Sequence, residues 1–208
     1  MKNIVIFGSG SGSNAENIFS YFSLRKNISV SLFVTNKKNS LFVDRAKRLG
    51  VNVFFIADKN FSNLSDLILL LNKNKTDLIV LAGFLLKVPL VLIDCFKNKI
   101  INIHPSLLPK FGGKGMYGIN VHNAVIKSNE SVSGITIHYV NEKYDDGEIL
   151  FQKSCTILPN ETAFSLSKKI QLLEHKFFPL IIEKTLYRWI FLFIHVLKIF
   201  KFCKTPWN

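Results

Sequence analysis

Short apolar segments alternate with amphipathic segments along most of the chain. The apolar segments are rich in β-branched residues and end in Gly, Asn or Asp, which is typical of buried strands. The amphipathic segments carry apolar residues at helical spacing, as Ile18, Phe19 and Phe22 do. The pattern predicts strands at 3–7, 29–34, 51–56, 77–82, 99–103, 132–140 and 149–157, and helices after a Ser13 or Asn14 cap and at 41–49, 63–74, 120–127 and 162–189. Residues 84–96 are also expected to be largely helical, apart from Pro89.

The order of these elements predicts the fold class. Strands and helices alternate through the first half of the chain, which favours an α/β fold with an open, mostly parallel, doubly wound sheet of Rossmann type. The last two strands flank the loop 141–148 and are expected to add antiparallel strands in the C-terminal half. In such sheets ligands bind beyond the carboxyl ends of the strands. Polar residues follow several predicted strands, so we expect the site at that edge.

Length and composition favour one domain in a reducing compartment. The chain has 208 residues, of which 48% are hydrophobic, and we expect one domain at 1–185 followed by an atypical basic and aromatic tail at 186–208. Its three cysteines are widely spaced and form no C-x-x-C pair, which argues against a zinc site or disulfides. A cytoplasmic location is the simplest expectation.

The strong positive charge of the chain adds little evidence for a nucleic-acid or membrane partner. The formal net charge is +13, but the basic residues are scattered, and there is no Arg-rich arm or aromatic–basic repeat. We therefore expect a generally basic surface and no nucleic-acid partner. The tail is interrupted by Arg188, His195, Lys198 and Lys201, which disfavours a membrane span. A helix packed on the domain or on a partner chain is favoured over an interfacial membrane helix.

A glycine-rich loop lies between the first strand and the first helix. It reads Gly8-Ser9-Gly10-Ser11-Gly12-Ser13-Asn14, and such loops let backbone N–H groups approach an anion at a helix N-terminus. It is not a Walker A motif, and Ser13 takes the third glycine position of a dinucleotide fingerprint. The second strand also ends without an acid for a ribose diol. A phosphate site is the favoured interpretation, with a plain turn as the alternative.

Asn102 and His104 stand two residues apart on the fifth predicted strand, so their side chains share a face. An amide donor beside an imidazole suits carbonyl chemistry, because one group can bind a developing oxyanion while the other moves a proton. Pro105 restricts the exit from the strand. Ser106 has no nucleophile-elbow sequence around it and is interpreted as a turn residue.

An acidic turn, Tyr144-Asp145-Asp146-Gly147-Glu148, follows the sixth predicted strand. It lacks the spacing of an EF-hand loop. One of its carboxylates could reach His104 and favour the imidazolium form. Spacing alone does not choose between Asp145 and Asp146.

Taken together, the motifs resemble those of the folate-dependent phosphoribosylglycinamide formyltransferases. The resemblance covers about 1–183 and rests on motifs that occur in this order: Gly12-Ser13-Asn14, Leu81-Ala82-Gly83-Phe84, Asn102-Ile103-His104-Pro105-Ser106-Leu107-Leu108-Pro109, Gly113-Lys114-Gly115-Met116-Tyr117-Gly118, Asp145-x-Gly147 and Glu174-His175.

The resemblance implies a role for each matched residue. Asn102, His104 and Asp145 would be catalytic, and His138 would match a family histidine near the site, although its strand alternation also suits a structural role. The substrate phosphate and ribonucleotide would be held by Gly12, Ser13, Asn14 and Glu174, and the folate by Leu85, Leu86, Lys87, Val88 and Asn102.

The chain also departs from the family pattern. Leu64 stands where some members carry an Arg for folate contact, so we expect the pterin end to be held differently. Asp146 replaces a common Gly beside the catalytic Asp. The tail after about residue 184 does not resemble the family's usual ending.

The implied activity is transfer of the formyl group of 10-formyltetrahydrofolate to the amine of glycinamide ribonucleotide in purine synthesis. Asn102 and a protonated His104 would stabilise the oxyanion, and Asp145 would keep His104 charged. No metal is expected, and the protein would be a monomer or homodimer. The alternatives are a formyltetrahydrofolate deformylase, or an inactive basic protein that binds nucleic acid or a membrane surface.

Overall fold

The computed structural model describes residues 1–187. The strands are β1 (Lys2–Phe7), β2 (Ile28–Thr35), β3 (Val53–Phe55), β4 (Thr76–Leu81), β5 (Ile100–His104), β6 (Val132–Tyr139) and β7 (Ile149–Thr156). The helices are α1 (Ser13–Ser23), α2 (Leu41–Leu49), α3 (Leu64–Lys73), α4 (Leu90–Cys95), α5 (Ile119–Lys127) and α6 (Ala163–Leu186).

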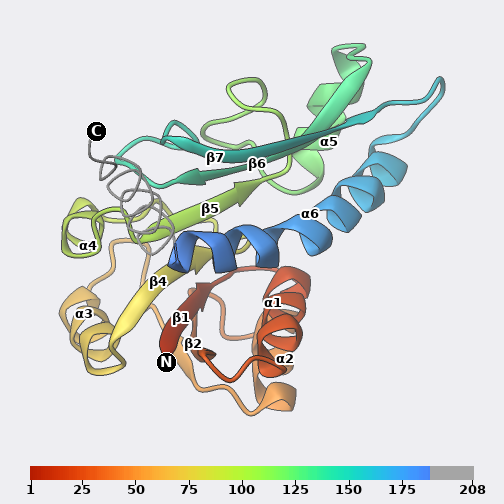
Figure 1. Ribbon diagram of the computed structural model, residues 1–208. Coiled ribbons are helices and arrows are strands. Elements are labelled where there is room, and N and C mark those ends of the chain that lie inside the picture. The colour runs from red at the N-terminus through yellow and green to blue at the C-terminus, as the bar shows by residue number, and fades with distance from the viewer. Residues whose placement is uncertain (188–208) are drawn as a thin grey trace, which may run out of the picture.

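All of the strands join one sheet in the order β3-β2-β1-β4-β5-β6-β7 (Figure 1). Strands β1 to β5 are parallel, whereas β6 runs antiparallel to β5 and β7 antiparallel to β6. The predicted α/β class, with antiparallel strands in the C-terminal half, is confirmed.

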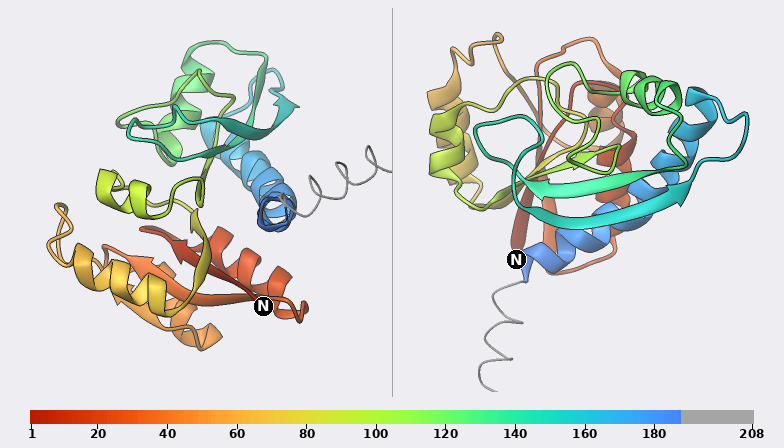
Figure 2. Two further views of the ribbon diagram at one scale, coloured as in Figure 1. Left: turned by 60° about the vertical axis from the view of Figure 1, so that its left-hand side comes forward. Right: turned by 90° about the horizontal axis from the view of Figure 1, so that it is seen from above.

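The central strands of the sheet, such as β1 and β4, are buried on both faces, since their consecutive side chains point to opposite sides and are buried in turn. Ile4 and Ile6 of β1 belong to a core cluster with α1, α2, α5 and α6, while Val5 and Phe7 belong to a second cluster with α3 and α4. Figure 2 shows α3 and α4 on the side of the sheet opposite α1 and α6. Burial on both faces explains why the buried stretches of these strands, residues 4–7 of β1 and 78–81 of β4, are apolar at consecutive positions.

The predicted helix at 84–96 is wrong over its first half. The structure has helix only at Leu90–Cys95, after Pro89, whose φ of −62° and ψ of 143° make it an extended cap. Proline disfavours helical backbone in the residue before it, so the helix cannot extend back through Val88. The apolar residues that suggested a helix instead form a loop, where the Leu85 N–H donates to the Ser9 hydroxyl at 3.1 Å.

Smaller differences concern the ends of elements. Gly12, not Ser13 or Asn14, caps α1, and no side chain caps it. The third strand is shorter than predicted, and α6 begins at Ala163 with Thr162 as its cap. The predicted helix end at 189 and almost all of the tail lie outside the described residues. Within residues 1–187, no helix is long and apolar enough to cross a membrane.

The topology places the site. The chain moves from β1 outward to β3 and then returns to the other side of β1 with β4, so the strand order reverses between β1 and β4. Loops leaving the two strands diverge at such a point and open a crevice beyond their carboxyl ends. The glycine-rich loop after β1, the Ala82–Leu85 segment after β4 and the end of β5 all meet there.

Candidate active site

A cleft of about 870 Å³ lies at this edge of the sheet. Its walls come from seven parts of the chain: the glycine-rich loop, the segment after β4, the end of β5, the loop between β5 and α5, the start of α5, the acidic turn, and one face of α6. All three predicted catalytic residues line it, as do Gly12, Ser13, Asn14 and Glu174. Residues far apart in the sequence therefore share one cavity.

One end of the cleft is the N-terminus of α1. Gly12 has a left-handed φ of 76°, and a Cβ there would lie 2.8 Å from the Cα of Phe42, so no other residue fits without a shift. The first N–H groups of a helix have no partner within the helix, and the helix dipole adds partial positive charge. This geometry suits a phosphate.

Helix α6 forms the wall beside that loop. Gln171 Nε2 donates to Ser13 Oγ at 3.0 Å, and Asn14 Nδ2 donates to Glu174 Oε2 at 2.8 Å. Burial raises the pKa of Glu174 to about 7, against the lowering effect of the Asn14 hydrogen bond. Sequence reasoning missed Gln171, although it precedes Glu174 by three residues and so lies on the same helix face.

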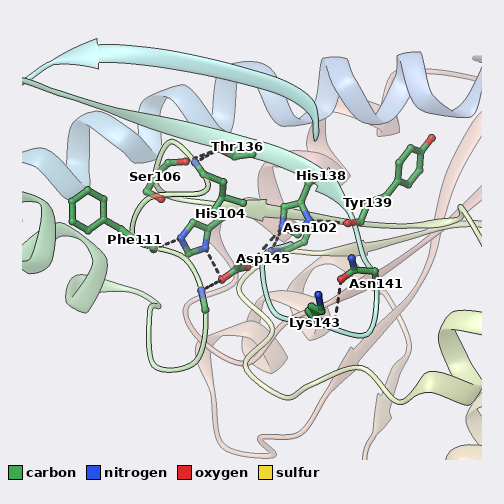
Figure 3. Close-up of polar contacts among 12 residues, drawn as sticks. Asn102, His104, Ser106, Phe111, Thr136, His138, Tyr139, Asn141, Lys143 and Asp145 are labelled. Atoms are coloured by element: carbon green, nitrogen blue, oxygen red, sulfur yellow. Dashed lines mark hydrogen bonds and ion pairs between the residues drawn. The ribbon is translucent and has the colours of Figure 1, made fainter. Parts of the chain in front are cut away.

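At the centre of the cleft, β5 and β6 place Asn102 and His138 directly opposite each other. His138 Nδ1 lies 2.8 Å from the Tyr139 carbonyl oxygen, which can only accept, so Nδ1 carries the proton and Nε2 is an acceptor. Asn102 Nδ2 then donates to that Nε2 at 3.1 Å (Figure 3). His138, which is 2% exposed, thus fixes the orientation of the Asn102 amide.

His104 is 3% exposed and is held from both sides (Figure 3). Its Nε2 donates to the Phe111 carbonyl at 2.7 Å, and its Nδ1 lies 3.5 Å from Asp145 Oδ2. Burial lowers the pKa of His104 below its ordinary value of 6.5, and the charge of Asp145 and the Phe111 carbonyl oppose this without overcoming it. A lowered pKa favours the neutral imidazole in the resting site, which differs from the expectation that Asp145 keeps His104 charged, because desolvation outweighs the neighbouring carboxylate.

The structure distinguishes the two adjacent acids. Asp145 accepts from the Gly113 N–H at 2.8 Å and from Asn102 Nδ2 at 3.4 Å, while Asp146 is exposed and pairs with Lys143 at 3.7 Å. Burial alone would raise the pKa of Asp145, but His138, His104 and the Gly113 N–H together lower it. Asp145 is therefore ionised beside His104. Asp145 has a left-handed φ of 53° and lines the cleft.

The predicted folate residues are only partly brought together. Leu85 lines the cleft, whereas Lys87 and Val88 line a separate hollow of about 380 Å³ nearby. Leu64 packs against the core cluster on the α3 side, as does Leu86. No group of three or more potential metal-ligating side chains occurs in the part of the chain that the structure describes.

Ser106 has a structural place. It is fully buried, and its hydroxyl donates to the Lys110 carbonyl at 2.7 Å, while its own carbonyl accepts from Thr136. These bonds fix the turn that brings Phe111 back to His104. The Phe111 carbonyl and the Gly113 amide were not foreseen, because backbone groups carry no residue-type signal.

Comparison with known proteins identifies relatives of this site. A family model described as Formyl transferase matches residues 2–182. Phosphoribosylglycinamide formyltransferase of Bacillus subtilis is 34% identical over 191 residues, which cover 89% of this chain and 95% of that protein. The chloroplastic enzyme of Arabidopsis thaliana is 42% identical over 183 residues, but the chain spans only 63% of its length, and 60% of the Vigna unguiculata relative.

Solved structures of similarly named proteins also resemble this chain. The glycinamide ribonucleotide transformylase 1 of Geobacillus kaustophilus has a TM-score of 0.81 and 31% identity, with 89% of this chain and 99% of that chain covered. Phosphoribosylglycinamide formyltransferase of Anaplasma phagocytophilum also has a TM-score of 0.81, with 29% identity and 90% and 88% of the two chains covered.

Proposed function

Because the chain belongs to the formyl transferase family, we propose that it transfers the formyl group of 10-formyltetrahydrofolate to the amine of N1-(5-phosphoribosyl)glycinamide. This is a step of de novo purine synthesis. The names of its relatives and the geometry of the cleft both support this choice. We propose a cytoplasmic enzyme, monomeric or homodimeric, with formyl-folate as co-substrate and no metal.

One observation carries the proposal. A helix N-terminus suited to phosphate and an amide–imidazole–carboxylate cluster suited to acyl transfer face the same cleft. An acceptor that bears a phosphate at one end and an amine at the other fits this arrangement. Holding it beside the formyl donor would supply much of the rate through positioning. Gly12, Ser13, Asn14 and Glu174 would bind the ribonucleotide end.

The chemistry begins with attack of the amine on the formyl carbon. The C–N bond forms as the carbonyl becomes an oxyanion, and the attacking nitrogen carries a positive charge. Asn102 would donate to that oxyanion through the hydrogen that makes only a long contact to Asp145, at 3.4 Å. Its other hydrogen stays on His138.

His104 would carry the proton between the two nitrogens. It starts neutral, and because Nε2 is engaged by the Phe111 carbonyl, the free position is Nδ1, which faces Asp145. The proton leaves the attacking amine for His104, and the imidazolium formed is stabilised by Asp145 at 3.5 Å. His104 then protonates the folate nitrogen as the C–N bond to it breaks, so charges and protons balance.

The folate would enter along the segment after β4, where Leu85 lines the cleft. Leu86, Lys87 and Val88 would contribute from just outside it, through backbone and apolar contacts. Leu64 packs against the core cluster, and a leucine carries no charge, so the folate would be held without the arginine found at this position in some members of the family.

The test is an assay of the purified protein with both substrates, following formation of the formylated ribonucleotide and loss of formyl-folate. Omitting the amine separates transfer from deformylation, because only a hydrolase consumes formyl-folate alone. Amine-dependent turnover would support the proposal. Amine-independent turnover would establish the deformylase, and absence of turnover with salt-sensitive binding to RNA or anionic vesicles would establish the inactive binding protein.

A further inference from the structure

A second histidine, His122 of α5, lines the cleft without a place in the mechanism above. It is 4% exposed, and its Nδ1 is sealed from solvent with no hydrogen-bond partner among residues 1–187. Burial, followed by the charge of His104, lowers the pKa of His122 to about 4. The ring is therefore neutral near pH 7 and carries one proton on one of its two nitrogens.

The buried Nδ1 of His122 decides which of the two ring nitrogens carries the proton. A proton on Nδ1 would leave a buried N–H donor without an acceptor, which costs the full desolvation penalty of that group. A lone pair on Nδ1 costs less, because unsatisfied acceptors are better tolerated than unsatisfied donors. The favoured tautomer carries its proton on Nε2, the nitrogen left to face the cleft. A neutral imidazole with a lowered pKa is a known form of hydrogen-bond donor.

The position of α5 tells which substrate this donor meets. Helix α5 packs against α6, which carries Gln171 and Glu174, and Val121 beside His122 belongs to the same core cluster as α1 and α6. Figure 1 shows α5 near the N-terminal end of α6. Val88, at the end of the predicted folate segment, packs on the opposite side of the sheet with α3 and α4. His122 therefore belongs to the ribonucleotide side of the cleft.

We propose that His122 binds the acceptor substrate by donating from Nε2 to an oxygen between its phosphate and its amine. Carbonyl and hydroxyl oxygens in that stretch are neutral acceptors, which match a neutral donor. The inference rests on the proposed function and adds a binding residue to it. His122 would hold the acceptor beside His104 and take no proton itself.

Three substitutions test the contact. His122→Phe keeps a ring but has no donor, and we expect the KM for glycinamide ribonucleotide to rise about tenfold, as for one hydrogen bond, with the KM for formyl-folate unchanged. Gln places its amide near the position of Nε2, so His122→Gln should restore most of the affinity. Asn reaches only the position of Nδ1, so His122→Asn should not. Exposed Asn123 on the same helix gives the control, Asn123→Ala.

An unchanged acceptor KM in His122→Phe, or equal rescue by Asn and Gln, would overturn the proposal. Nitrogen-15 NMR of the unmutated protein gives a reading that does not depend on variants folding: we expect the neutral Nε2–H form of His122 between about pH 5 and 8. An Nδ1–H form would also overturn it. A wild-type protein without amine-dependent turnover would instead count against the proposed function, while the NMR reading would still stand.

Discussion

Removing the charge of Asp145 tests the centre of the site. Asp145→Asn keeps the shape of the side chain but removes the carboxylate that lies 3.5 Å from His104 Nδ1. It also leaves one donor unmatched, because both carboxylate oxygens accept from N–H groups, one from Gly113 and one from Asn102. An amide offers a single oxygen for these two donors. We therefore expect a loss of rate and a small loss of stability.

The size of the rate loss follows from the geometry. Two unit charges 3.5 Å apart attract by about 5 kcal/mol at an effective dielectric constant of about 20, which sets an upper bound. Opposite charges at such distances usually shift a pKa by about 1–3 units, or about 1.4–4 kcal/mol. Because the imidazolium of His104 forms during the reaction, losing Asp145 would lower its population by the factor that corresponds to this pKa shift. We expect kcat to fall about 10- to 1000-fold.

The assay is the kcat/KM–pH profile with both substrates, combined with thermal unfolding. The charge of Asp145 raises the pKa of His104. Replacing Asp145 should therefore shift the part of the kcat/KM–pH profile that reports the titration of His104 to lower pH. Asp146→Asn is the matched control, since Asp146 is exposed and, among residues 1–187, pairs with Lys143 and Asn141, and it should behave as the unmutated protein. A variant Asp145→Asn within about twofold of the unmutated kcat, with the same pH profile, would refute the role given to this acid.

Three further substitutions follow from the site. His138→Phe should free the Asn102 amide to rotate and lower kcat about tenfold with little change in either KM; a change in KM alone would contradict this. Glu174→Gln should abolish a pH dependence of stability: a carboxyl whose pKa rises from 4.5 to about 7 on folding favours the folded state by about 3 kcal/mol at low pH, and this is lost as pH rises through that window. If the melting temperatures of the unmutated protein and of Glu174→Gln changed in parallel from pH 4 to 8, this contribution of Glu174 would be excluded. Gly147→Ala would bring a Cβ into the Tyr139 carbonyl oxygen, so urea unfolding should show a loss of at least about 2 kcal/mol.

Much of the fold could be predicted because both faces of the sheet are buried. Residues 4–7 of β1 and 78–81 of β4 are all apolar, so their length and flanking turn residues were enough to find these strands. The error at 84–96 has the same origin, because apolar residues in a loop look like those of a helix. Pro89, which the prediction treats as an exception within the helix, is in fact the cap after which the helix begins. The family resemblance is confirmed, since it rested on several motifs in a fixed order.

The site could be predicted only where residue type and spacing carry the geometry. Asn102 and His104 share a strand face, which the two-residue spacing encodes. The choice of Asp145 over Asp146 depends on a left-handed turn that no spacing reveals. The resting charge of His104 depends on two opposing effects, because burial lowers its pKa and the charge of Asp145 raises it. The residue types alone do not give this balance.

The pairing of Asn102 with His138 has a consequence for transplanting this chemistry. Opposed residues of an antiparallel ladder keep their side chains on one face, so the backbone hydrogen bonds of β5 and β6 set the distance between them. A slip of one residue would bring Ile137 or Tyr139 opposite Asn102 and turn the histidine to the other face of the sheet. Grafting Asn102 and His138 onto another scaffold would therefore require both strands in the same register, because the two side chains alone do not specify how the strands align.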